Sequence, residues 1–379
     1  MIVLLLSQTA FEEMGAASSI FKYVRYLCYL LILQDSYREK QIWGVAILGV
    51  LTVGTVVCSG NSTFILYLIM ILAAKEVNVR TIVKLTCIIQ GAMLLSIVVM
   101  SQIGIIPDYI FDASTRQRHG LGFLWTTTGA ILYFYFMVLY IYLREERAHL
   151  IEYVILEAVN FGLYKLTDAR MSFYLSTLLL IYVYVMRFYW QNRKDRIRKN
   201  RLLIGAPAFF CILAVACQIF YIPTDARWQK INSVLSGRLE LGCFGWRDYG
   251  FSLLGTKIEW IGFSHNATAG TYNYVDCSYM QILLENGLIP LIIIIAVYTY
   301  IMYMAVKEKD FYLQTAVLLI TAFSITEPRL LNLAYNPLPF FGITYISLRG
   351  RSALFHREGH RLNRRVRFRT THVRLKARK

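Results

Sequence analysis

Apolar runs that approach the length needed to cross a lipid bilayer recur along almost the whole chain, and they limit the fold more than any other feature. A helical crossing takes roughly 17–25 residues. The runs lack the polar–apolar alternation of barrel strands, so they predict helices. Their positions are 20–34, 42–58, 61–74, 81–106, 121–143, 148–164, 172–190, 202–222, 280–305, 311–325 and 332–348.

The composition agrees with this interpretation. Apolar residues make up 57% of the chain, whereas soluble domains hold about 45–50%. The opening MIVLLLSQTAF is too short to span alone, and it lacks the charged start of a signal peptide. Two interpretations stay open, a truncated first helix and a mis-chosen start codon. We therefore expect an all-α polytopic membrane protein with about 11–12 transmembrane helices.

Basic residues set the expected orientation. The stretches QNRKDRIRKNR and RGRSALFHREGHRLNRRVRFRTTHVRLKARK are dense in Lys and Arg, and such segments stay on the cytoplasmic side. The sequence thus predicts a membrane domain over 1–348 and a cytoplasmic tail over 349–379. The tail has a second interpretation as a nucleic-acid-binding arm, but basic tails beside a span more often lie on anionic lipid headgroups. We therefore expect membrane lipids and no nucleic acid as partners.

With that orientation, a few charged residues fall on the outer side, where the positive-inside rule does not need them. The short loop RQRHGLGF holds Arg116, Arg118 and His119. A large outer loop over about 223–275 holds Arg238 and is rich in tryptophan, and Asp276 follows it. The turn TEPR places Glu327 and Arg329 around a helix-breaking proline.

Arginines at a membrane surface suit a phosphate or diphosphate, because the guanidinium fork binds phosphate oxygens in pairs and stays charged. Gly120 and Gly122 would let the next helix begin close to such an anion. The alternative is that the arginines only extend to the interface. Asp276 likewise has two interpretations, as a site residue or as the cap of a helix that begins near Ser278. Cys243 and Cys277 lie in a loop, and the sequence leaves their pairing open.

Four motifs in order (RHGLGF, NSVLSGRL with GFSLLG, VDCSYMQILLENGLI and TEPRLLNLAYNPL) resemble those of Wzy-type polysaccharide polymerases, the repeat-unit polymerases of Gram-positive capsule and exopolysaccharide clusters. The family pattern at the first motif continues with His-Pro-Asn, where this chain has Leu124-Trp125-Thr126-Thr127, so no role of that His and Asn carries over. The resemblance implies a fold similar to the GT-C-like membrane glycosyltransferases related to O-antigen ligases. It also implies an undecaprenyl-diphosphate-linked oligosaccharide substrate, no metal or soluble cofactor, and reaction on the extracytoplasmic side of the bacterial cell membrane. Candidate partners are a flippase and a chain-length regulator of the same pathway.

The resulting hypothesis transfers the growing glycan from its lipid diphosphate to a sugar hydroxyl of the next lipid-linked unit. Arginines stabilise the departing diphosphate and a carboxylate or histidine accepts the hydroxyl proton. His265 is a further, weaker base candidate. The catalytic candidates are Arg118, Arg238, Glu327, Asp276 and His119. The substrate-binding candidates are Arg116, Arg329, Asn232, Trp246 and Trp260.

Two alternatives remain at the level of the sequence. A ligase-like glycan transferase would use the same residues. A flippase or secondary transporter for lipid-linked sugars predicts internal repeats and charges near the bilayer midplane. The chain shows no clear repeat, and its unusual charges cluster on the predicted outer rim, which favours a transferase.

Overall fold

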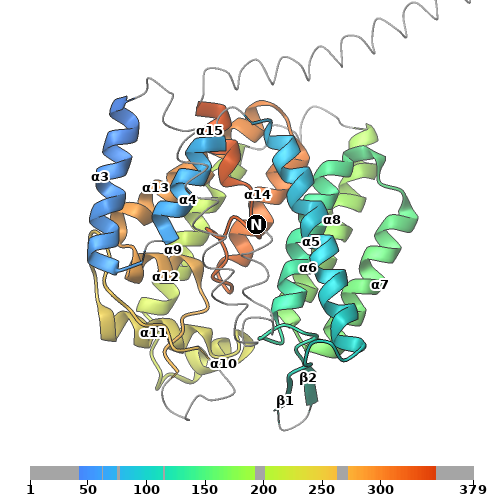
Figure 1. Cartoon of the computed structure of the whole chain (residues 1–379), viewed down its shortest axis with the longest axis horizontal. Helices are drawn as coiled ribbons and strands as arrows, with labels where there is room; N and C mark the ends of the chain where they lie inside the picture. Colours follow the sequence, from blue (N-terminus) through green and yellow to red (C-terminus); the bar gives the residue numbers. More distant parts are fainter. Residues whose placement is uncertain are drawn as a thin grey trace, which may run out of the picture.

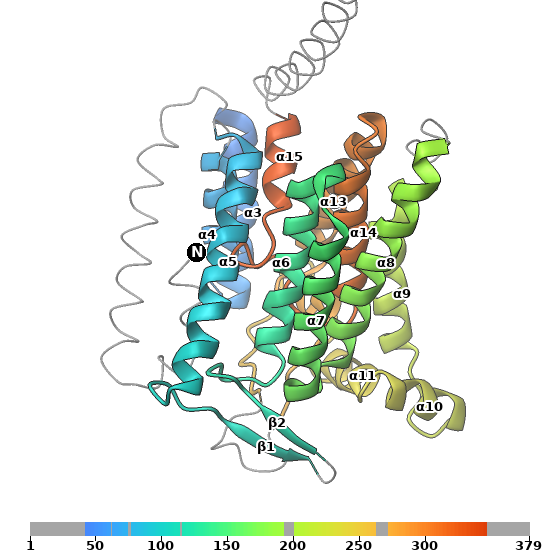
Figure 2. The ribbon, with the colours of Figure 1, turned by 90° about the vertical axis from the view of Figure 1, so that its right-hand side faces the viewer.

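The computed structural model describes residues 42–61, 63–74, 77–113, 116–192, 201–262 and 272–346, and these are mostly helical. Long helices lie side by side as a bundle, and a β-hairpin and some of the short helices lie at one of its ends (Figures 1 and 2). The long helices are α3 (Ile42–Ser59), α4 (Thr63–Ala73), α5 (Val79–Gln102), α6 (Thr128–Arg144), α7 (Leu150–Thr167), α8 (Arg170–Asn192), α9 (Ala206–Ile219), α13 (Leu288–Lys307) and α14 (Phe311–Phe323). The shorter ones are η3 (Glu145–Arg147), η5 (Arg201–Gly205), α10 (Ala226–Val234), α11 (Arg238–Tyr249), α12 (Ser278–Glu285) and α15 (Pro339–Ile346).

Three helical stretches are long and apolar enough to cross a membrane: α5, η5 with α9, and α13. Helices at the rim expose large apolar side chains, among them Leu95 of α5, Val154 of α7 and Ile212 of α9. Such surfaces are rare on soluble monomers and suit a hydrocarbon environment. The chain is therefore a helical membrane protein, as the sequence predicted.

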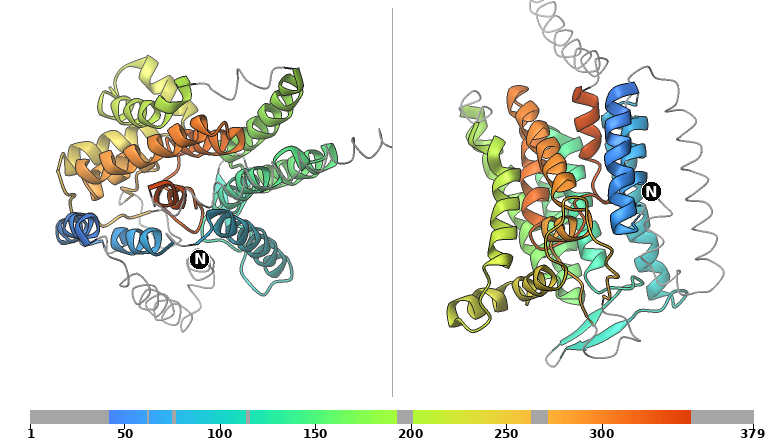
Figure 3. Two further views of the ribbon diagram at one scale, coloured as in Figure 1. Left: turned by 90° about the horizontal axis from the view of Figure 1, so that it is seen from above. Right: turned by 90° about the vertical axis from the view of Figure 1, so that its left-hand side faces the viewer.

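The core surrounds α6 and α14, which are buried along most of their length. Seen along the bundle, α15 lies in the middle, with α13, α14, α6, α5 and α4 around it (Figure 3, left). The irregular segment 324–338 enters the same interior. Its backbone groups find polar partners there: Gln90 donates to Ala334 O and Tyr335 O, each at 2.8 Å, and Asn336 donates to Leu330 O at 2.7 Å. Irregular backbone is tolerated inside a membrane protein when it is satisfied in this way.

Each segment predicted as a span between 42 and 348 contains a helix, but three were wrong in their bounds. The run 121–143 is helical only from Thr128. The run 280–305 is two helices, α12 and α13, because the chain turns at Asn286-Gly287, where Gly287 has φ 95°. The run 332–348 is helical only from Pro339, because its first residues form the satisfied irregular segment. The predicted span 20–34 and the tail 349–379 lie outside the described residues.

A hairpin at one end of the bundle was also missed by the sequence analysis. Strands β1 (Ile110–Ala113) and β2 (Arg116–His119) pair antiparallel, with Phe111 opposite Arg118. The predicted large loop 223–275 begins at the same end and folds in part into α10 and α11 (Figure 2). We call this end of the bundle the hairpin end.

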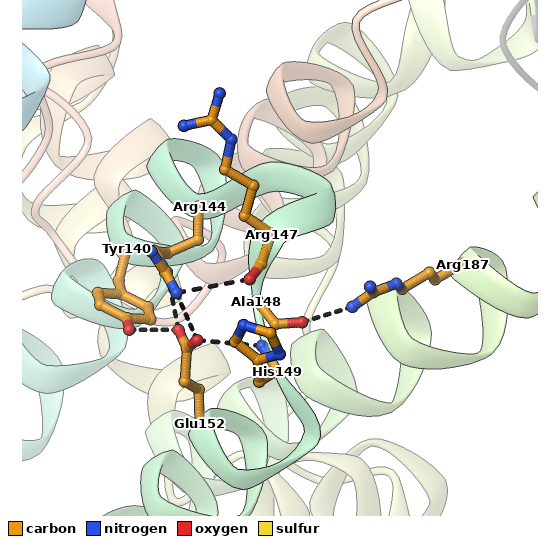
Figure 4. Close-up of polar contacts among 7 residues, drawn as sticks. All are labelled: Tyr140, Arg144, Arg147, Ala148, His149, Glu152 and Arg187. Carbon is orange, nitrogen blue, oxygen red and sulfur yellow. Dashed lines mark hydrogen bonds and ion pairs between the residues drawn. The ribbon is translucent and has the colours of Figure 1, made fainter. Parts of the chain in front are cut away.

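Polar contacts at the opposite end fasten the α6–α7 connection (Figure 4). Arg144 donates through Nε and a terminal nitrogen to both carboxylate oxygens of Glu152, and Glu152 also accepts from Tyr140 and from the backbone of His149. Arg187 of α8 donates to Ala148 O. These contacts involve the sequence REER at residues 144–147. The bidentate pair and the capping contact form a structural clamp that holds the neighbouring helices α6 and α7 together.

Candidate functional site

Arg238 is held at the start of α11 by a network of local contacts. Gly237 precedes the helix in a left-handed conformation with φ 82°. The side-chain oxygen of Asn232 accepts from Leu239 N at 3.0 Å and from Glu240 N at 3.3 Å, which satisfies the first free amides of the helix. The fixed helix start aims the Arg238 side chain into the protein, where it is only 16% exposed.

Arg238 contacts two carboxylates and two backbone carbonyls, one of which is Leu235 O, to which a terminal nitrogen donates at 3.5 Å. It donates from Nε to Thr326 O at 2.9 Å and from a terminal nitrogen to Glu327 Oε1 at 3.1 Å, and its Nε lies 3.9 Å from Asp276 Oδ2. The Glu327 side chain is 8% exposed and that of Asp276 27%. The helix that follows Asp276 is capped at Cys277 without a side-chain bond, so Asp276 is not the predicted helix cap.

Glu327 is positioned by α12. Ser278 N donates to Ser324 O at 2.9 Å, and the Ser278 hydroxyl donates to Glu327 O at 2.5 Å while it accepts from Leu330 N at 3.1 Å. One serine thus fixes both sides of the turn that carries Glu327. Contacts between segments far apart in sequence therefore fix the backbone that carries the Glu327 carboxylate.

Arg329 adds a second guanidinium. Its centre lies 5.2 Å from the ring centroid of Tyr335, a cation–π contact. Its Nε is buried and has no hydrogen-bond partner among the described residues, although Glu327 is close enough to act on its charge. A buried donor without a partner costs free energy, so this arginine is poised for an added acceptor. We call Arg238, Asp276, Glu327 and Arg329 together the charge cluster.

Burial shifts the protonation of both carboxyls. Desolvation raises the pKa of Glu327 to about 7, with the positive charges of Arg238 and Arg329 opposing the rise. Desolvation also raises the pKa of Asp276, and the same arginines oppose it. A carboxyl with a pKa near neutrality can accept a proton and later release it. Glu327 is accordingly suited to a role as a base.

Arg118 lies on β2 and reaches toward α7, where its Nε donates to Thr167 O at 3.0 Å. Burial lowers the pKa of Arg118, while Asp168 raises it and the charges of Arg170 and Arg238 lower it further. The positive charges of Arg118 and Arg238 are therefore close enough to repel each other at the hairpin end. The Arg116 backbone pairs with Ala113 in the hairpin, and its side chain lies outside the description.

His119 follows Arg118 on the strand and points to the other face, as alternation requires. There its Nδ1 lies 2.6 Å from Asp108 Oδ2, and Asp108 Oδ1 accepts from Leu121 N at 2.7 Å. Gly122, with φ 83°, packs so tightly on α5 that a Cβ would lie 2.9 Å from an Ile97 methyl carbon. We expected Gly120 and Gly122 to let the next helix begin close to an anion. This expectation was wrong, because α6 begins only at Thr128.

The remaining candidates have structural contacts. Besides capping α11, the Asn232 amide donates to Tyr221 and Glu240, so its polar atoms are used within the protein. Trp246 packs on the main core, and Trp260 also does so while donating to Glu285 Oε2 at 3.2 Å. Cys243 and Cys277 are free thiols. His265 lies outside the described residues.

Several residues of the site carried no signal in the sequence. Ser278, Thr326 and Tyr335 position the cluster through a hydroxyl, a carbonyl and a ring face, and Asp108 orients His119. Only the tertiary fold brings them together with the predicted residues. Within the described part of the chain, no three His, Cys, Asp or Glu side chains gather as they would around a metal ion.

Comparisons with protein-family models, curated proteins and solved structures give no match to this chain.

Proposed function

We propose that this protein is a GT-C-like membrane glycosyltransferase of the Wzy type. In this proposal it polymerises polyprenyl-diphosphate-linked oligosaccharide units on the outer face of the bacterial cell membrane. The observation that carries the proposal is the charge cluster at the hairpin end of a membrane helix bundle. Arginine and carboxylate groups buried in such a protein are costly and are usually kept for function.

The cluster offers the two kinds of group that this transfer needs. Arg238 and Arg329 can receive the negative charge that develops on the leaving diphosphate, with Arg118 as a neighbouring positive charge. Glu327 can take the proton of the acceptor hydroxyl. The incoming diphosphate competes with Glu327 for Arg238, and its binding would free the carboxylate to act as the base.

The proposed step balances as follows. The acceptor oxygen bonds to the anomeric carbon of the donor glycan, and its proton goes to Glu327. The bond from that carbon to the diphosphate oxygen breaks, and the oxygen keeps the electron pair. Polyprenyl diphosphate departs with one more negative charge, and Glu327 returns its proton to water.

The proposal is tested in cells that lack the gene and carry either the wild type or a variant. We expect wild type to give long lipid-linked glycans and Arg238→Ala to leave single repeat units that an added glycosidase reaches from outside. Arg247→Ala is the matched control, because Arg247 lies exposed on the same helix.

The alternatives give different products in the same experiment. Long lipid-linked chains that are never transferred onward would identify a ligase. Single units that stay protected on the inner leaflet would identify a flippase. Long glycans in cells that carry Arg238→Ala would show that the charge cluster takes no part in the transfer.

A further inference from the structure

A small pocket opens between the start of α4, helix α12 and the segment 328–332, and it encloses about 150 Å³. Polar and apolar groups share its wall. The polar side comes from Asn61, Gln281, Glu285 and Asn286, among others, and the apolar side includes Phe64. This mixture is typical of a specific small-molecule site.

Asn286 supplies one recognition group of the pocket. It is 6% exposed and lines the pocket. Its side-chain amide offers two donors and one acceptor, which are the groups that bind sugar hydroxyls.

Glu285 supplies a second recognition group. Asn61 Nδ2 donates to one of its carboxylate oxygens, and Trp260 Nε1 donates to the other at 3.2 Å. Each oxygen keeps capacity for another donor, because an ionised carboxylate accepts about four hydrogen bonds. Neutral donors thus hold the Glu285 carboxylate in place, and it can accept further hydrogen bonds from the hydroxyl groups of a ligand.

The pocket is built rigidly. Gly255 and Gly287, with φ 102° and 95°, let the 252–256 segment pack on the end of α12, and a Cβ on Gly255 would lie 2.1 Å from Glu285 O. Thr256 N donates to Glu285 O at 3.2 Å. The GFSLLG and LLENGL motifs therefore meet to hold Glu285 and Asn286.

The pocket adjoins the charge cluster. Ser278 and Pro328 both line it, and Ser278 donates to the backbone oxygen of Glu327. No Lys or Arg belongs to the described lining, so the pocket does not suit a diphosphate. In the proposed reaction the donor's reacting sugar adjoins its diphosphate and must lie by the arginines, whereas the acceptor contributes only a sugar hydroxyl at the point of reaction.

We infer that this pocket binds a neutral sugar ring of the acceptor glycan. Asn286 and Glu285 would hold neighbouring hydroxyl groups, and Phe64 would lie against an apolar part of the ring. The assignment to the acceptor rests on the proposed function, whereas the sugar-binding property can be measured without any transfer.

The test is saturation-transfer NMR on the full-length protein in detergent, with methyl glycosides of glucose, galactose, mannose and N-acetylglucosamine as lipid-free probes. We expect at least one to bind the wild type, and to bind Asn286→Leu and Gln281→Leu about tenfold more weakly or not at all. Gln102→Leu, on the exposed end of α5, should bind as wild type does. Asn286 is buried and Gln281 is half-buried, so a folding defect in one variant does not decide the result.

Failure of every glycoside to bind would overturn the inference, as would wild-type binding in both Asn286→Leu and Gln281→Leu. The proposed function fails separately, by long glycans in cells that carry Arg238→Ala. In a transfer assay, Asn286→Leu should raise the KM for the acceptor with little change in kcat, and an unchanged KM would contradict the assignment to the acceptor.

Discussion

Replacing Arg238 by methionine should destabilise the protein strongly, because it leaves buried carboxylates without their partner. Glu327 is 8% exposed and lies 3.1 Å from the guanidinium, and Asp276 lies 3.9 Å from it. Removing one member of a buried pair costs about 3–5 kcal/mol. This is a large part of the roughly 5–15 kcal/mol that holds a typical domain.

Neutralising the stranded carboxyl should recover part of the loss. We expect Arg238→Met with Glu327→Gln to cost about 1–3 kcal/mol less than the sum of the two single changes. The assay is unfolding in mixed micelles of dodecyl maltoside and sodium dodecyl sulfate at pH 8, followed by circular dichroism. Arg170→Met is the control, because Arg170 is exposed and its pair with Asp168 should contribute only about 0–1 kcal/mol.

The penalty should also depend on pH. Burial raises the pKa of Glu327 to about 7, so the folded state holds this proton more tightly than the unfolded state does. Protonation therefore favours folding at low pH, and this contribution is lost as the pH rises through about 7. In Arg238→Met the pKa should rise further, and the substitution should cost less at pH 5.5 than at pH 8. A cost equal to that of Arg170→Met, or strict additivity in the double variant, would refute this reasoning.

Three further substitutions test other parts of the structure. Asn232→Ala should lower the free energy of unfolding by about 1–2 kcal/mol by removing the α11 cap, and no loss in the same assay would contradict that role. Gly255→Ala should cost of the order of 1–3 kcal/mol, because its Cβ would collide with Glu285 O at a positive φ; unchanged stability would show that the contact is looser. Glu152→Gln should lower the Tm by a few degrees while glycan length in cells stays the same, whereas shortened glycans would give the clamp of Figure 4 a part in function.

The helical membrane class was predictable from the sequence, because each long apolar run by itself predicts a helix in an apolar environment. The boundaries were less so. The run 280–305 is apolar on both sides of Asn286-Gly287, so hydropathy alone did not reveal the turn that separates α12 from α13. The segment 332–338 carries enough apolar residues to have been counted as the start of a span. Two of its carbonyls accept from Gln90, which is distant in sequence.

The charge cluster was predicted in part. Arg238, Asp276, Glu327 and Arg329 stood out because charge beside apolar runs is costly, and the structure brings them together. Their supports did not stand out. Ser278 looks like an ordinary helix-start serine, and its bonds to Glu327 and Leu330 exist only once α12 meets the 324–338 segment.

His119 shows the opposite case. Adjacent to Arg118 in sequence, it seemed part of one motif with it, but the β-hairpin sends neighbouring side chains to opposite faces. It pairs with Asp108 instead. The hairpin was missed because its strands are short, four residues each, and because every residue of β2 is polar.

The most direct test of the proposed transfer uses purified protein in liposomes with a single polyprenyl-diphosphate-linked repeat unit. Glycan length and released polyprenyl diphosphate are measured together, for wild type, Arg238→Lys and Arg247→Ala. We predict a ladder of longer glycans with one diphosphate lipid released per bond for wild type and Arg247→Ala. Arg238→Lys should be slower by about 10²–10³, because lysine cannot reproduce the guanidinium contacts. Unchanged single units with wild-type protein would contradict the proposed transfer, and a full ladder with Arg238→Lys would contradict the role of the charge cluster.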